Sequence, residues 1–165
     1  MSKLRVAVIG SGQVARTSHI NHYKSLPDVE VSAVCDVNQE AAKMAADEFL
    51  IPSWYTDAGT MLEEIRPDAV SICVPNKFHC DTTCLCLEHG CHVLCEKPFG
   101  VDALECQKAL NYAEMSGRVC MIGLCYRGIP GYMYLKKLID DGSLGKIFYI
   151  RQSLGGNRIA NPQVK

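Results

Sequence analysis

The chain has 165 residues, of which 48% are hydrophobic and 21% are charged, and its formal net charge is −1. This length suffices for one well-buried domain and is too short for two full ones. The near-zero charge gives no electrostatic reason to expect nucleic acid or an anionic membrane as a partner. No stretch approaches the roughly 20 apolar residues that span a bilayer, and the N-terminal apolar run is too short for a signal peptide. We therefore expect a cytoplasmic protein.

Short apolar segments alternate with amphipathic ones along most of the chain. The segments expected to be strands are 5–9, 29–35, 53–55, 68–74, 92–95 and 119–124. Those expected to be helices are 13–25, 39–49, 57–65, 82–88 and 102–116, with Asp57 and Asp102 as N-caps. Near-continuous apolar strands that alternate with helices predict a parallel sheet with helices on both faces. We expect an α/β domain of the Rossmann type, with a doubly wound parallel sheet, over residues 1–125.

The chain beyond this domain is expected to contain a helix over residues 131–141 and one further strand over residues 147–153. That strand has no partner in the sequence, and a strand alone is not a stable unit. We therefore interpret residues 126–165 as a linker helix and the start of a second α/β domain that is truncated.

The ten cysteines need an interpretation, because five of them crowd together at Cys80, Cys84, Cys86, Cys91 and Cys95. Zinc and iron–sulfur sites usually contain paired C-x-x-C spacings, and none occurs here. Buried thiols behave as small hydrophobic side chains, and a reducing cytosol keeps them free. We interpret the cysteines as structural thiols and expect no metal site.

A glycine-rich turn joins the first strand to the first helix, with the sequence Gly10-Ser11-Gly12-Gln13-Val14-Ala15. In this G-x-G-x-x-A pattern the first glycine permits a tight turn and the second lets the backbone approach a pyrophosphate. The pattern is weak evidence by itself, but here it has the required strand–turn–helix context. Gly10, Ser11, Gly12, Gln13 and Val14 are therefore candidates for holding the pyrophosphate of a dinucleotide at the helix N-terminus.

Asp36 follows the second strand, where a carboxylate can accept hydrogen bonds from an adenosine ribose. Asp36 could instead be a solvated turn residue or a helix cap. A carboxylate at this place would repel a 2′-phosphate, and no arginine follows it immediately, so we expect NAD rather than NADP.

Three polar clusters follow the fourth, fifth and sixth strands and thus share the carboxyl edge of the predicted sheet. They are Val74-Pro75-Asn76 with His79, Glu96-Lys97-Pro98, and Tyr126-Arg127. Ligands of open α/β sheets bind at this edge. Other interpretations stay open: His79 could cap the following helix, Lys97 could pair with Glu96, and Arg127 could neutralise nearby carboxylates.

Taken together, these features resemble the family of glucose–fructose oxidoreductase, inositol dehydrogenase and the rhizopine-catabolism protein MocA. The resemblance covers about residues 4–151. It rests on Gly10-x-Gly12-x-x-Ala15 with His19, Asp36, Pro75-Asn76-x-x-His79, Glu96-Lys97-Pro98, Tyr126-Arg127 and the stretch Leu135–Lys146.

The resemblance implies a set of cofactor-binding residues. They are Ser11–Val14, Asp36, Val74, Pro75, Asn76, His79, Glu96, Lys97 and Arg127. Ser11–Val14 and Asp36 would hold the pyrophosphate and the adenosine ribose, and the others would border the nicotinamide end. Lys97 would also face the substrate and polarise or relay a proton from the hydroxyl that is oxidised, which makes it the catalytic candidate.

The implied function is hydride transfer between NAD(P) and a sugar, a polyol or a related hydroxylated small molecule. Relatives continue into a second α/β domain that forms much of the substrate pocket and usually the interface of a homo-oligomer. Three interpretations therefore stay open for this chain. It could be a fragment of a working dehydrogenase, a non-catalytic NAD-binding module, or part of an NAD-dependent glycosidase.

Overall fold

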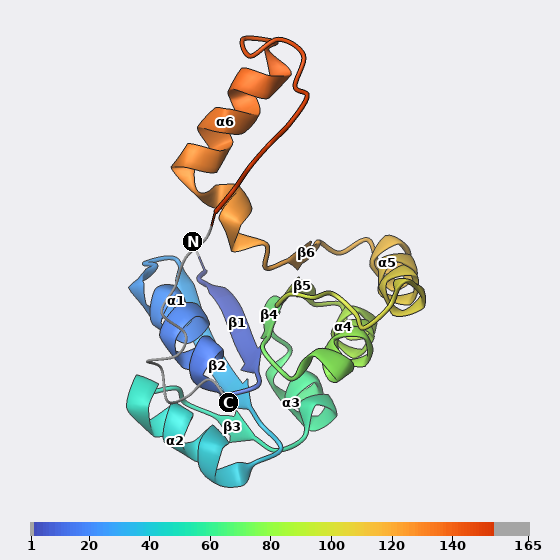
Figure 1. Ribbon diagram of the computed structural model, residues 1–165. Coiled ribbons are helices and arrows are strands. Elements are labelled where there is room, and N and C mark those ends of the chain that lie inside the picture. Colours follow the sequence, from blue (N-terminus) through green and yellow to red (C-terminus); the bar gives the residue numbers. More distant parts are fainter. Residues whose placement is uncertain (1, 154–165) are drawn as a thin grey trace. The chain divides into compact units, whose positions relative to one another are not determined.

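The computed structural model describes residues 2–153 of the chain (Figure 1). By internal contacts the chain divides into two compact units, the first ending at Leu124 and the second beginning at Cys125.

The first unit is built on a six-stranded sheet in which all neighbouring strands are parallel. Its strands are β1 (Leu4–Ile9), β2 (Val29–Cys35), β3 (Trp54–Tyr55), β4 (Ala69–Ile72), β5 (His92–Cys95) and β6 (Cys120–Ile122). Their order in the sheet is β3-β2-β1-β4-β5-β6, which is the strand order of Rossmann folds. The predicted doubly wound α/β fold is confirmed. The strand order reverses between the neighbouring strands β1 and β4, and in such sheets the connections that follow the two strands leave a crevice at their carboxyl ends.

The helices of the first unit begin close to the predicted places, with one clear exception. They are the π-helical segment η1 (Ala15–Ile20), α1 (Asn21–Ser25), α2 (Gln39–Phe49), α3 (Ala58–Ile65), the 3-10 turn η2 (Asn76–Phe78), α4 (His79–Glu88) and α5 (Ala103–Ser116). Asp57 caps α3 by accepting the Thr60 N–H at 2.7 Å, and Asp102 caps α5 in the same way. The start of α4 was predicted at Thr82 and lies three residues earlier, because the turn η2 leads directly into the helix.

The first helix contains a feature that a 3.6-residue pattern cannot reveal. Residues 13 and 14 are α-helical, residues 15–20 are π-helical, and α1 then continues to Ser25. Within the π-helical segment, Ala15, His19 and Ile20 are buried. π-Helical turns are rare and occur frequently at functional sites.

Helices cover both faces of the sheet, and each face has its own apolar cluster. On one face Ala15 and Ile20 of η1, with Ala45 and Ala46 of α2, pack against strand residues such as Val8. On the other face α3 and α4 pack against the opposite side of β1, β4 and β5. All ten cysteines are free, and six of them are buried: Cys35, Cys80, Cys84, Cys86, Cys91 and Cys95.

The second unit contains the 3-10 turn η3 (Cys125–Gly128) and helix α6 (Pro130–Asp140), which matches the predicted helix to within one residue. The strand predicted over residues 147–153 is wrong, since these residues have no regular secondary structure. A strand needs a hydrogen-bonding neighbour, and its apolar sequence alone does not supply one. Among residues 2–153, no helix is long and apolar enough to cross a membrane.

Candidate cofactor site

A cavity of about 760 Å³ lies at the carboxyl ends of β1, β2 and β4, beside the glycine-rich turn. Seven of the residues singled out in the sequence line it: Gly10, Gly12, Gln13, Val14, Asp36, Val74 and Pro75. These residues come from three loops that are far apart in the chain. The parallel sheet brings them together because all three loops leave the same edge.

The two glycines of the turn are required for different reasons. Gly10 has φ +91°, and a Cβ atom there would lie 2.6 Å from the carbonyl carbon of Cys73, so the protein itself demands glycine. At Gly12, by contrast, an added Cβ would meet no atom of the described residues within 4 Å. The protein therefore has space for a side chain at Gly12, and this space lies at the start of a helix where a pyrophosphate would approach. The turn fits a dinucleotide.

Asp36 is held in a defined orientation at the wall of this cavity. Its Oδ2 accepts both the N–H and the hydroxyl of Ser11, each at 2.8 Å, and its Oδ1 accepts the Asn38 N–H at 2.9 Å. A carboxylate has about four acceptor positions, so Oδ1 retains one for a ribose hydroxyl. Asn38, not Asp36, caps α2. Ser11 is buried behind the carboxylate and does not line the cavity.

Two cysteines complete the cavity wall as neutral groups. Burial raises the pKa of the Cys35 thiol to about 12, and the nearby carboxylates of Asp57 and Asp36 act in the same direction. Burial likewise raises the pKa of Cys73 to about 12, with a further contribution from Glu96. Both thiols are protonated at pH 7 and present a small apolar surface to a bound ligand.

His79 lies behind this wall with only 1% of its surface exposed. Its Nδ1 is 2.5 Å from the Pro98 carbonyl oxygen, and its Nε2 is 2.8 Å from the Val74 carbonyl oxygen. A neutral imidazole has one N–H, so both contacts are hydrogen bonds only in the imidazolium form. In either form the ring joins the loop after β4 to the loop after β5. His79 is the first residue of α4 and not its N-cap, which is Phe78.

Glu96 and Lys97 follow β5 at the same edge of the sheet. The Glu96 carboxylate accepts the Lys97 backbone N–H at 3.1 Å and lies 3.2 Å from Nε2 of His19. The peptide bond between Lys97 and Pro98 is cis. The Lys97 side chain is exposed, and within the part of the chain that the structure describes its ammonium group has no ion pair.

Other predicted positions remain predictions. Asn76 is exposed at the start of η2 and does not line the cavity. Arg127 lies in η3 of the second unit, so its place near the nicotinamide stays an expectation. Sequence reasoning overlooked Ser71, which contacts His19, and Gly123, which lies against the Glu96 carboxylate. A serine inside the apolar strand β4 was the available signal for the first.

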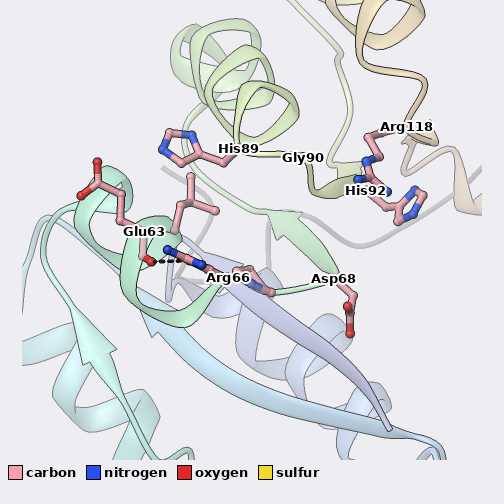
Figure 2. Close-up of a pocket in the computed structure, with 9 residues that line it drawn as sticks. Glu63, Arg66, Asp68, His89, Gly90, His92 and Arg118 are labelled. Atoms are coloured by element: carbon pink, nitrogen blue, oxygen red, sulfur yellow. Dashed lines mark hydrogen bonds between the residues drawn. The ribbon is translucent and has the colours of Figure 1, made fainter. Parts of the chain in front are cut away.

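A second cavity, of about 580 Å³, lies at the opposite edge of the sheet, before the first residues of β4 and β5. Figure 2 shows Glu63 and His89 on one side of it and His92 and Arg118 on the other. It is lined by charges of both signs, with Arg66 Nε donating to the Glu63 carbonyl at 3.3 Å. Because ligands of open α/β sheets bind at the carboxyl edge, we assign the cofactor to the first cavity.

The sequence itself matches a known family over most of the first unit. Residues 4–124 match the family described as "Oxidoreductase family, NAD-binding Rossmann fold" (GFO_IDH_MocA). The chain belongs to this family. The first unit is its NAD-binding Rossmann domain, and the resemblance inferred from the motifs is confirmed.

Among the relatives are dehydrogenases and a glycosyl hydrolase, all of longer chain length. The chain is 37% identical over 147 residues to the D-glucoside 3-dehydrogenase of Escherichia coli (strain K12). This match covers 89% of this chain and 42% of the dehydrogenase. It is 31% identical over 146 residues to an inositol 2-dehydrogenase of Salmonella agona (strain SL483), and this match covers 87% of this chain and 43% of the dehydrogenase. The solved structure of myo-inositol 2-dehydrogenase from Lactobacillus plantarum superposes with a TM-score of 0.81 at 29% identity, over 88% of this chain and 43% of that one. The chain therefore spans less than half the length of these relatives.

Proposed function

We propose that this chain is the cofactor-binding part of an NAD-dependent dehydrogenase that oxidises a hydroxyl group of a sugar or polyol. The observation that carries the proposal is the pairing of Gly12, which leaves open space at a helix start, with an oriented Asp36 carboxylate in one cavity. The substrate class is supported by relatives that include a glucoside dehydrogenase and inositol dehydrogenases.

At the adenosine end, the backbone of the glycine-rich turn and the start of the first helix would hold the pyrophosphate. The free acceptor position on Asp36 would take a hydroxyl of the adenosine ribose and repel a 2′-phosphate, which favours NAD over NADP. Val74 and Pro75 would form the opposite wall.

At the nicotinamide end, Glu96 would accept hydrogen bonds from the second ribose, and Lys97 would face the substrate. Bound NAD supplies the acceptor for the hydride that leaves the substrate carbon. The Lys97 ammonium group would polarise the substrate hydroxyl or relay its proton, since it lies at this edge and has no ion pair among the described residues.

Titration of the chain with NADH and with NADPH, followed by nicotinamide fluorescence, tests this proposal. We expect saturable binding that prefers NADH, and we expect Asp36→Ala to weaken NADH binding by about tenfold or more and to abolish the preference. Asp57→Ala is the matched control, because this carboxylate also lines the cavity but caps α3. A folded chain that binds neither nucleotide would contradict the proposal.

Two alternatives concern the intact protein. A non-catalytic module would bind NADH and show no turnover with any sugar or polyol. A glycosidase that uses NAD transiently would cleave glycosides without net accumulation of NADH, whereas the proposed dehydrogenase accumulates NADH with each turnover. We also propose a cytoplasmic location and a homo-oligomeric parent protein, the first supported by ten free cysteines and the second by the family resemblance.

A further inference from the structure

A continuous set of buried and half-buried polar side chains runs from the first helix, across β4, to the carboxyl edge of the sheet. Tyr23 donates its hydroxyl hydrogen to Oγ of Ser71 at 3.2 Å, and Ser71 Oγ lies 2.6 Å from Nδ1 of His19. The other ring nitrogen of His19 lies 3.2 Å from Oε1 of Glu96. Ser71 is fully buried and His19 is 8% exposed, so water cannot readily replace these contacts.

The direction of each hydrogen bond follows from the groups involved. The Glu96 carboxylate only accepts, so Nε2 of His19 must carry a hydrogen. In the neutral imidazole Nδ1 then accepts, which makes Ser71 the donor at that contact. Ser71 in turn accepts from Tyr23, whose pKa is raised by burial and whose hydroxyl therefore stays protonated. Every donor in the set points toward Glu96.

The surroundings of Glu96 are shaped to keep its carboxylate in this position. On one side is Gly123, where a Cβ atom would lie only 3.1 Å from Oε1 of Glu96. The second carboxylate oxygen is taken by the Lys97 backbone N–H. His19 itself lies in the π-helical segment, where it is buried together with its neighbour Ile20.

We propose that His19 is a positioning residue for the cofactor reaction: by donating to Glu96 it orients this carboxylate toward the nicotinamide ribose. Ser71 and Tyr23 hold the imidazole in the tautomer that can donate. The inference rests on the proposed function, since it assigns the partner of Glu96 at that same site. His19 touches no reacting atom.

Two substitutions of His19 separate the contact with Glu96 from the rest of the set. A glutamine amide nitrogen can occupy the place of Nε2, whereas an asparagine amide nitrogen occupies that of Nδ1 and does not reach Glu96. We expect His19→Asn to raise the Kd for NADH by about tenfold, the size of one lost hydrogen bond to a charged group. His19→Gln should bind NADH within about twofold of the original chain.

The comparison ligand is ADP, which occupies the adenosine end and lacks the nicotinamide ribose. Both variants should bind ADP as the original chain does, because Asp36 and the glycine-rich turn are unchanged. With Glu96→Gln already present, His19→Asn should add little further loss of NADH affinity. Equal losses for ADP and NADH, or no loss for NADH in His19→Asn, would overturn the inference.

A second variant acts on Glu96 from the other side and keeps His19 intact. Gly123→Ala places a methyl group against Oε1 of Glu96 and should produce the same selective loss for NADH, even if His19→Asn does not fold. Unchanged NADH affinity in Gly123→Ala would count against the inference. Failure of the proposed function looks different, because the original chain would then bind neither NADH nor ADP.

Discussion

The two ends of the candidate site are built in different ways. At the adenosine end, the shape is set by a turn of consecutive residues, Gly10–Val14, and by one carboxylate that is oriented by Ser11 and Asn38. At the proposed nicotinamide end, Glu96 contacts His19, and His79 lies between the carbonyl oxygens of Val74 and Pro98. Turn chemistry therefore governs the first end, whereas contacts between distant segments govern the second. Substitutions should affect backbone geometry at the first end and side-chain contacts at the second.

Gly10→Ala should have the largest effect on unfolding free energy, because the added methyl group disturbs the backbone turn that shapes the adenosine end. The new Cβ would lie 2.6 Å from backbone atoms of Cys73 in a conformation with φ +91°. We expect a loss of unfolding free energy of about 3 kcal/mol or more, measured by urea denaturation.

Gly12→Ala is the matched control for that change. Its Cβ meets no atom of the described residues, so unfolding free energy should change by less than about 1 kcal/mol. NADH affinity should nevertheless fall strongly, because the methyl group occupies the approach of the pyrophosphate. A Gly12→Ala chain that binds NADH normally would show that no dinucleotide approaches this turn.

His79→Ala should have the next largest effect, and it tests the nicotinamide end. The substitution removes a buried ring and leaves two carbonyl oxygens, those of Val74 and Pro98, without this partner. We expect a loss of about 2–4 kcal/mol of unfolding free energy. His89→Ala is the control, since His89 is exposed and its ring, among residues 2–153, bonds to no group but the nearby Leu85 carbonyl. Similar losses of unfolding free energy in both variants would contradict the role of His79 in joining the two loops.

A smaller effect is expected from alkaline pH. The pKa of Cys35 and that of Cys95 are each raised by burial to about 12, from an ordinary value of 9.0. Between pH 9 and 12 the unfolded chain releases these protons while the folded chain keeps them, so unfolding free energy falls as pH rises. Urea midpoints measured from pH 8 to pH 11 should therefore decrease. Cys95→Ala should reduce this dependence by the contribution of one thiol, whereas Cys125→Ser, at an exposed position, should leave it unchanged.

Lys97→Met should have the smallest effect on stability. The ammonium group is exposed, so unfolding free energy should stay within about 0.5 kcal/mol of the original value. If the intact protein has the proposed dehydrogenase activity, the same change should lower turnover by about 100-fold or more, since the group that polarises the hydroxyl or relays its proton is removed. Lys43→Met, at an exposed position on α2, should leave both quantities unchanged. Full turnover in Lys97→Met would exclude its catalytic role.

Local patterns in the sequence were sufficient to identify the domain. Apolar strands that alternate with helices, the glycine-rich turn and the N-caps Asp57 and Asp102 all depend on residues close together in the chain. For the same reason Asp36 could be placed beside the turn, because parallel strands bring their carboxyl ends to one edge.

Only the tertiary structure decided which polar side chains at this edge contact one another. Nothing local indicates that His19 contacts both Ser71 and Glu96, since these residues lie 52 and 77 positions further along the chain and His19 itself lies in a π-helical segment. The apolar run at 147–153 shows the opposite case, in which local preference for a strand was not sufficient. A strand and a buried hydrogen bond both need a partner from elsewhere in the chain, and the sequence pattern around one residue does not name that partner.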